Sequence, residues 1–354
     1  MKALNFGFCI AIVCICTACN SEKTIKNADS FLAGEAQTSA SRIFEDKVGS
    51  PDEFIALDTL GLYRPYLFNV DNNKLVIYSG PPNSKFWVTN TENPSENYMF
   101  GSNGRGPGEY LNPIDVELAS DGSIFVVDSQ LRRLDKWSHS GELIDSKSID
   151  SFAPYRITLP EHSNKLLIFA PSEERLFHRY DNRYNHLSSF QTAPDSLRFL
   201  LKNVYLSGEI DSDDSSIFYA GNGNHFLKKY STDGKLLYSR LMIEEIAPPS
   251  LVTESVDNGG GETLKISDDF KKAARTITYY QNKIYVLYFG NNVNLIGRTV
   301  DVYDSDSGDY LYSLNISSND RRASSIDIDS DGVLYSLEYD KNMNFNVFTY
   351  KLSI

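Results

Sequence analysis

After residue 19 this chain of 354 residues has no cysteine, because all four of its cysteines lie between Cys9 and Cys19. The remainder can form no disulfide, so its fold must depend on an apolar core. A chain of this length can bury one. Tyrosine and phenylalanine are abundant, at 22 and 20 residues. Such a high aromatic content favours β structure.

The chain is also poor in basic residues. Without the first eighteen residues, of which only Lys2 is charged, it has 33 basic and 47 acidic side chains, a net charge of −14. Nucleic acids and anionic membrane surfaces bind clustered lysine and arginine. The charge balance therefore argues against both as partners.

The cysteines belong to an N-terminal targeting signal. A basic start at Met1-Lys2 precedes a nearly uninterrupted apolar run from Ala3 to Cys16, which is too short for a permanent transmembrane helix. The tetrad that ends it, Cys16-Thr17-Ala18-Cys19, resembles a bacterial lipobox. This predicts a lipoprotein signal peptide over residues 1–18 and acylation of Cys19, with an ordinary cleaved signal as the alternative.

The predicted lipid indicates where in the cell the protein is located. We expect it to be anchored through Cys19 in the cell envelope, outside the cytoplasm, with the outer membrane as the expected membrane and the leaflet left open. Residues 19–40 are small and polar, without a sustained apolar period. They are predicted to be a flexible tether to the folded part.

An internal repeat with a period near fifty residues indicates the fold. The clearest unit, Ile114 to Ile149, contains four short strands separated by Ser120-Asp121-Gly122 and Ser140-Gly141 turns. The second strands of successive units are predicted to begin at 74, 123, 165, 216, 283 and 333, in steps of 49, 42, 51, 67 and 50 residues. The long step contains an insertion over roughly residues 244–269. Six four-stranded units at this spacing are typical of a β-propeller.

The ring is predicted to close through the N-terminus. The last unit stops after its third strand, Phe345 to Leu352, while Glu53 to Leu60 has no other partner. We expect that segment to complete the last blade, which removes an exposed sheet edge. The prediction is an all-β, single six-bladed β-propeller over residues 41–354, and a two-sheet sandwich is the alternative.

One segment resembles a known family. Gly104-Arg105-Gly106-Pro107-Gly108-Glu109-Tyr110 follows Tyr98-Met99-Phe100-Gly101 and is similar to the GxGPGEY signature of Bacteroidota six-bladed propeller lipoproteins, often called TolB-like. The resemblance implies a lipid-anchored propeller. It implies no settled activity and no catalytic residues.

A calcium-loop pattern is present but is interpreted as a turn. Asp327, Asp329, Asp331 and Gly332, followed by Glu338, match the EF-hand spacing. The flanking segments alternate as strands, so the loop lacks its helices and we expect an Asp-Gly hairpin turn. The five histidines fall in predicted turns or third strands, and no serine-nucleophile, P-loop or dinucleotide motif is found. We expect no metal and no cofactor.

Arginine recurs where each predicted first strand begins. In a propeller these segments surround one mouth of the central channel, so the arginines could bind an anionic or polyhydroxylated ligand. Glu109 is a further candidate ligand-binding residue that is also expected to brace the glycine-rich loop, and Tyr110 and Tyr155 are expected to stack on the ligand. Alternatively, the arginines pair with nearby acids and only hold loops. The arginines are Arg64, Arg105, Arg156, Arg198, Arg275, Arg321 and Arg322, with Arg132, Arg133 and Arg175 on the neighbouring loops.

Three functions are compatible with these patterns. The favoured one is a ligand- or protein-binding module of the envelope, with an anionic or carbohydrate ligand or an envelope protein as partner. A hydrolase or lyase acting on a carbohydrate or peptide would need paired acid and base groups, for which Glu109, Asp115 and Asp327 are candidates. The third is a structural subunit of an envelope complex.

Overall fold

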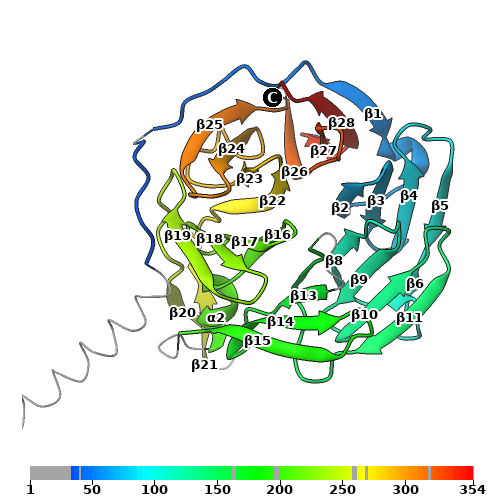
Figure 1. The fold of residues 1–354 in the computed structure, drawn as a ribbon, viewed down its shortest axis with the longest axis horizontal. Coiled ribbons are helices and arrows are strands. Elements are labelled where there is room, and N and C mark those ends of the chain that lie inside the picture. The colour runs from blue at the N-terminus through cyan, green and yellow to red at the C-terminus, as the bar shows by residue number, and fades with distance from the viewer. Residues whose placement is uncertain are drawn as a thin grey trace, which may run out of the picture.

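The protein is a ring of six four-stranded antiparallel sheets around a central axis, seen along that axis in Figure 1. The computed structural model describes residues 33–39, 41–160, 165–194, 199–256, 261–267, 270–317 and 320–353. The predicted six-bladed β-propeller is confirmed. The predicted signal peptide, Cys19 and most of the tether lie outside the described residues. No helix of the described residues is long and apolar enough to cross a bilayer.

Within each blade the strands follow one another from the inner strand outward. Blade 1 is β2 (Pro65–Asp71), β3 (Lys74–Ser79), β4 (Lys85–Asn90) and β5 (Asn97–Phe100); blade 2 is β8 (Pro113–Leu118), β9 (Ile124–Asp128), β10 (Arg133–Trp137) and β11 (Leu143–Ser148). Blade 3 is β12 (Arg156–Thr158), β13 (Lys165–Phe169), β14 (Arg175–Asp181) and β15 (His186–Thr192); blade 4 is β16 (Gly208–Ser212), β17 (Ser216–Gly221), β18 (Phe226–Ser231) and β19 (Leu236–Leu241). Blade 5 is β22 (Ala274–Tyr280), β23 (Lys283–Tyr288), β24 (Thr299–Asp304) and β25 (Tyr310–Asn315); blade 6 is β26 (Arg321–Ile328), β27 (Val333–Asp340), β28 (Phe345–Lys351) and β1 (Asp52–Ala56).

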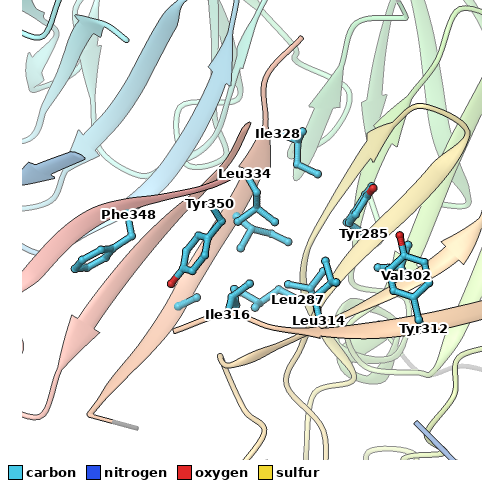
Figure 2. Packing of buried hydrophobic residues seen from close by; sticks show 13 residues of the cluster. Tyr285, Leu287, Val302, Tyr312, Leu314, Ile316, Ile328, Leu334, Phe348 and Tyr350 are labelled. Carbon is cyan, nitrogen blue, oxygen red and sulfur yellow. The ribbon is translucent and has the colours of Figure 1, made fainter. Parts of the chain in front are cut away.

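The second strand of each blade is apolar on both faces because neighbouring blades cover both. All five residues of β9 are buried, and so are the last five of β23. Figure 2 shows the packing between blades 5 and 6, where Leu287 and Leu334 are fully buried in a cluster that includes Tyr285. Each fully buried aliphatic side chain contributes about 1.5–3 kcal/mol. The core is therefore a ring of inter-blade layers.

The ring closes as predicted. β1 pairs antiparallel with β28, with Glu53 opposite Phe348, and so becomes the outer strand of blade 6. The closing strand is shorter than the predicted segment, since Leu57–Leu60 forms the 3₁₀ helix η1 and Leu57 is fully buried. The two end segments of the propeller thereby share one sheet.

The calcium-loop pattern forms a hairpin turn between β26 and β27. Asp329 accepts hydrogen bonds from the amides of Asp331 and Val333, and Gly332 has a φ of +77°, which favours glycine. Glu338 is fully buried on β27, where the Tyr350 hydroxyl donates to it. Its carboxylate therefore belongs to the packing of blade 6.

A strap formed by residues 33–49 precedes the closing strand and runs around the outside of blades 4, 5 and 6 (Figure 1, dark blue). Its backbone pairs with the outer strands of blades 4 and 5 and with the end of β28 in blade 6: Glu35 with Ser239 and Leu241, Glu45 with Ser313, and Gly49 with Lys351. Described residues before position 41 thus already contact the propeller.

Short elements complete the fold. They are β6 (Ser102–Asn103), β7 (Glu109–Tyr110), α2 (Phe199–Tyr205), and the hairpin of β20 (Leu251–Val256) and β21 (Gly261–Ile266), which lies within the predicted insertion.

Candidate functional site

The six inner strands run in the same direction around the central channel, so its two ends differ. We call the end where these strands begin the arginine mouth and the end where they finish the carboxylate mouth. The inner strands are β2, β8, β12, β16, β22 and β26.

Arg156 at the arginine mouth is fully engaged. Its Nε and Nη2 donate to Glu209 at 2.5 and 2.9 Å, and its Nη1 donates to the carbonyls of Ile114 and Tyr155. The guanidinium carbon also lies 4.3 Å from the centroid of the Tyr155 ring. Burial would raise the pKa of Glu209, but Arg156, aided by Arg275, holds that pKa below its ordinary value. These groups therefore link β12 to β16.

Four of the other predicted arginines have contacts of their own. Arg321 Nε lies 3.4 Å from Glu338 Oε2, whereas Arg275 and Arg322 donate to backbone carbonyls at 3.3 Å. Arg64 lies over the Tyr63 ring, and Arg105 has no ion pair within the described residues. Arg198 falls outside the described residues. The structure thus brings Tyr155, Arg156 and Arg275 together around Glu209 and leaves the remaining arginines apart.

The glycine-rich loop is braced by its neighbours. Glu109 Oε2 accepts a hydrogen bond of 2.7 Å from the Gly106 amide, and Arg133 donates to the Gly106 and Glu109 carbonyls. Tyr110 is only 1% exposed, and Trp137 Nε1 donates to its hydroxyl at 2.7 Å. Tyr110 therefore packs between blades 1 and 2 and does not present its ring to a ligand.

The carboxylate mouth opens into a cavity of about 840 Å³. Of the described residues, ten carboxyl and three lysine side chains line it, and Lys136 and Lys229 lie within 3.6 and 3.0 Å of Asp121 and Asp306. The lining carboxyls are Asp71, Glu117, Asp121, Asp181, Asp211, Asp213, Asp214, Asp306, Asp327 and Asp329. Carboxyl groups therefore outnumber lysines at this mouth.

Six side chains at equivalent positions of the inner strands form what we call the floor ring. The positions are equivalent because each residue is paired with the second-strand residue that lies two positions after the predicted start of that strand. Those starts are residues 74, 123, 165, 216, 283 and 333. The floor ring is Asn69, Glu117, Thr158, Asp211, Thr278 and Asp327. Neutral residues on blades 1, 3 and 5 thus alternate with acids on blades 2, 4 and 6.

Two of the three acids join neighbouring blades. Asp327 on blade 6 accepts from the Val70 amide at 2.8 Å and the Thr278 hydroxyl at 2.8 Å, so it contacts blades 1 and 5. Asp211 on blade 4 accepts from the Tyr279 amide of blade 5 at 2.5 Å. Both carboxylates are therefore part of the structure that holds the ring together.

Blade 2 uses a different acid for the same bond. The Ile157 amide of blade 3 donates to Asp115, two residues before Glu117, at 2.8 Å. The carboxyl of Glu117 makes no hydrogen bond or ion pair with any residue in the described part of the chain. Glu117 is the one floor-ring acid that does not link blades.

The channel carboxyls have raised pKa values. Burial raises the pKa of Glu117 well above its ordinary value, and the charges of Asp211, Asp115, Asp327 and Asp71 add to the effect. Burial likewise raises the pKa of Asp211 to about 8 and those of Asp115 and Asp327 to about 7. Near neutral pH we therefore expect Asp115, Asp211 and Asp327 to be partly protonated.

Sequence patterns did not predict this cavity, although two of the channel carboxyls were among the candidates. Asp115 and Asp327 do lie in the channel, whereas Glu109 is in the loop of the arginine mouth. The available signal was an acid inside an apolar inner strand, as in Ile210-Asp211 and Ile326-Asp327. No group of three or more His, Cys, Asp or Glu residues in the described ranges is arranged to hold a metal ion.

Comparison with known proteins identifies the fold alone. No family model and no curated protein matches the sequence. Solved structures do match. The streptogramin B lyase structure has 12% identity and a TM-score of 0.50, over 86% of this chain and 97% of that one. The structure of U3-55K has 8% identity and a TM-score of 0.55, over 85% of this chain and 98% of that one. Hydrazine synthase of Kuenenia stuttgartiensis has 11% identity and a TM-score of 0.50, over 83% of this chain and 97% of that one. What they share with this chain is the propeller.

Proposed function

We propose that this chain is a lipid-anchored binding protein of the bacterial cell envelope that holds a positively charged ligand at the carboxylate mouth. One observation carries the proposal: a cavity of about 840 Å³ that the described part of the chain lines with ten carboxyl groups and three lysines. Ligand pockets have volumes of roughly 300–1,000 Å³. A concave site lined by one sign of charge focuses the field and raises the local concentration of an oppositely charged ligand.

The location follows from the N-terminal signal. The membrane would be contacted through the lipid on Cys19, with the outer membrane as the proposed site, and nucleic acid is not a proposed partner. We expect the protein to incorporate a fatty-acid analogue in cells, and Cys19→Ala to abolish that labelling. A Cys19→Ala protein that still labels would disprove the lipid anchor.

The arginine mouth supports a second binding site less well. An anionic or carbohydrate ligand there would need free guanidinium donors, but Arg156 already uses its donors on Glu209 and two carbonyls. Among the described residues, Arg275 makes a single hydrogen bond, to the Ser324 carbonyl. A protein partner in the envelope remains compatible with either mouth.

An enzymatic role is a second candidate, favoured by the raised pKa values in the channel. Burial raises the pKa of Asp211 to about 8 and that of Asp327 to about 7, which suits proton transfer near neutral pH. A hydrolase or lyase would turn over a carbohydrate or peptide bound there. Turnover of a bound compound would favour this candidate over a binding role.

Binding at the carboxylate mouth can be tested with defined cations. We expect spermidine to raise the melting temperature and to bind in calorimetry, with an affinity that falls as sodium chloride rises from about 50 to about 300 mM. The double variant Glu117→Gln, Asp211→Asn should bind at least tenfold more weakly. The control Glu53→Gln, Asp58→Asn removes the same number of carboxyl groups from exposed positions and should bind normally.

Two results would contradict this site. Stabilisation by citrate instead of spermidine, lost in Arg275→Ala and kept in the Glu117 and Asp211 double variant, would transfer the ligand site to the arginine mouth. Equal weakening by both double variants would indicate only general charge attraction and contradict the cavity.

A further inference from the structure

We infer that Glu117 is the group that binds the positive end of the ligand, and that it releases a proton when it does so. This inference deepens the proposed function and rests on it. It names the ligand class as a small organic amine with two or more ammonium groups.

The three floor-ring acids differ in what holds them. Asp211 and Asp327 accept from amides of the next blade, at 2.5 and 2.8 Å. In blade 2 that bond is made by Asp115, which holds the Ile157 amide. Asp211 in blade 4 and Asp327 in blade 6 thus link neighbouring blades, whereas Glu117, at the same position in blade 2, does not. Glu117 also has no polar partner among the described residues.

Glu117 is surrounded by other acids. Its charged neighbours come from four inner strands: Asp71 on β2, Asp115 on β8, Asp211 on β16 and Asp327 on β26. The remaining inner strands, β12 and β22, contribute only hydroxyls to the floor ring, Thr158 and Thr278. No cation belongs to the floor ring. The lysines of the cavity lie on other strands, and two of them are paired with Asp121 and Asp306.

This surplus of acids keeps a proton in the empty site. Buried carboxyls that share one channel cannot all ionise, because each charge opposes the next. Burial, with the four aspartates, raises the pKa of Glu117 well above its ordinary value, so the empty site keeps a proton there. An ammonium group can replace that proton: the carboxylic acid loses H⁺ to solvent, and the carboxylate pairs with the ammonium. Charge and atoms balance without another reactant.

The spread of the acids indicates a ligand with more than one positive charge. The carboxyl groups that line the cavity come from several blades and are distributed over a volume of about 840 Å³. A compound with ammonium groups several bonds apart can pair with Glu117 at the floor and with acids nearer the rim. Asp213 and Asp214 lie in the turn that follows β16 and face the same cavity. A polyamine has this chemistry.

Titration of the empty protein tests the retained proton. We expect potentiometric titration of the folded protein to show protons released above the ordinary titration range of carboxyl groups, with fewer released by Glu117→Gln. Glu53→Gln removes an exposed glutamate and should titrate like wild type in this range. Identical curves for wild type and Glu117→Gln would show that Glu117 holds no proton there, and would overturn the inference.

Proton release on binding is measured with spermidine as the probe. Calorimetry near pH 7 in two buffers of different ionisation enthalpy should show proton release on binding to wild type and little with Glu117→Gln. Affinity for wild type should rise about tenfold per pH unit for one released proton, and less than about threefold for the variant. Spermidine binding without proton release would overturn the inference and leave the proposed function intact. Failure of spermidine to bind would overturn both.

Discussion

Arg42→Ala is expected to lower the free energy of unfolding by about 3–5 kcal/mol. Arg42 in the strap donates to both carboxylate oxygens of Asp301 at 2.9 Å and to Glu244 at 2.7 Å, and its guanidinium lies 4.1 Å from the centroid of Tyr288. The Arg42 and Asp301 side chains are only 11% and 5% exposed. Removing the cation leaves a buried carboxylate without its partner, which costs more than a surface ion pair contributes.

Urea unfolding of the wild type and the variant measures this loss. Lys47→Ala is the matched control, because Lys47 pairs with Glu45 at 2.8 Å in the same strap but both side chains are well exposed. We expect the control to change stability by less than about 1 kcal/mol. Equal losses for Arg42→Ala and Lys47→Ala would show that burial of the Arg42 pair contributes nothing.

Stability is expected to fall as the pH rises from about 5 to about 9, by on the order of a few kcal/mol. Burial raises the pKa of Asp211 to about 8 and those of Asp115 and Asp327 to about 7. An unfolded chain ionises aspartate near about pH 4, so between that pH and the folded pKa the folded state binds more protons. Each rise in pH within this window therefore favours unfolding, and the effect levels off once the pH exceeds the folded pKa values.

Melting temperatures at several pH values check the sign. Glu117→Gln removes a carboxyl whose own pKa is raised by burial in the folded protein, so the stability of the variant should depend less on pH than that of wild type. Glu53→Gln, at an exposed position, should follow the wild-type curve. A wild-type protein more stable at about pH 9 than at about pH 6 would contradict the raised pKa values of the channel.

The fold could be predicted because it depends on patterns local to each blade. The second strands begin at or within one residue of the predicted positions, since a strand covered on both faces is a conspicuous apolar run, as in Ile124–Asp128. The closing strand was predictable because the last repeat lacks a strand and an unassigned one precedes the first. Its end was not, since the buried Leu57 turns the chain into η1.

The sites were less predictable because their partners are distant in sequence. The position of Arg156 follows from its place in the repeat, but its pairing with Glu209 depends on how the neighbouring blades 3 and 4 meet. The sequence predicts that Tyr110 can stack on a ligand. In the structure Tyr110 is buried, and Trp137, 27 residues later in the chain, donates a hydrogen bond to its hydroxyl. The floor ring could not be predicted without the strand register. The register decides whether Glu117 or Asp115 accepts the hydrogen bond from blade 3. Arg42 reaches partners more than 200 residues away, and no local pattern marks that.

The strap also has a mechanical consequence. A pull on the chain before residue 33 is first resisted where Glu35 pairs with β19, then at β25, and then at the end of β28. Between the first two attachments, Gln37 donates to the carbonyls of Leu241 and Gly308, on blades 4 and 5. The load is divided among three blades in series before it reaches β1. A tension applied through the N-terminus would thus have to peel the strap before it could open the ring.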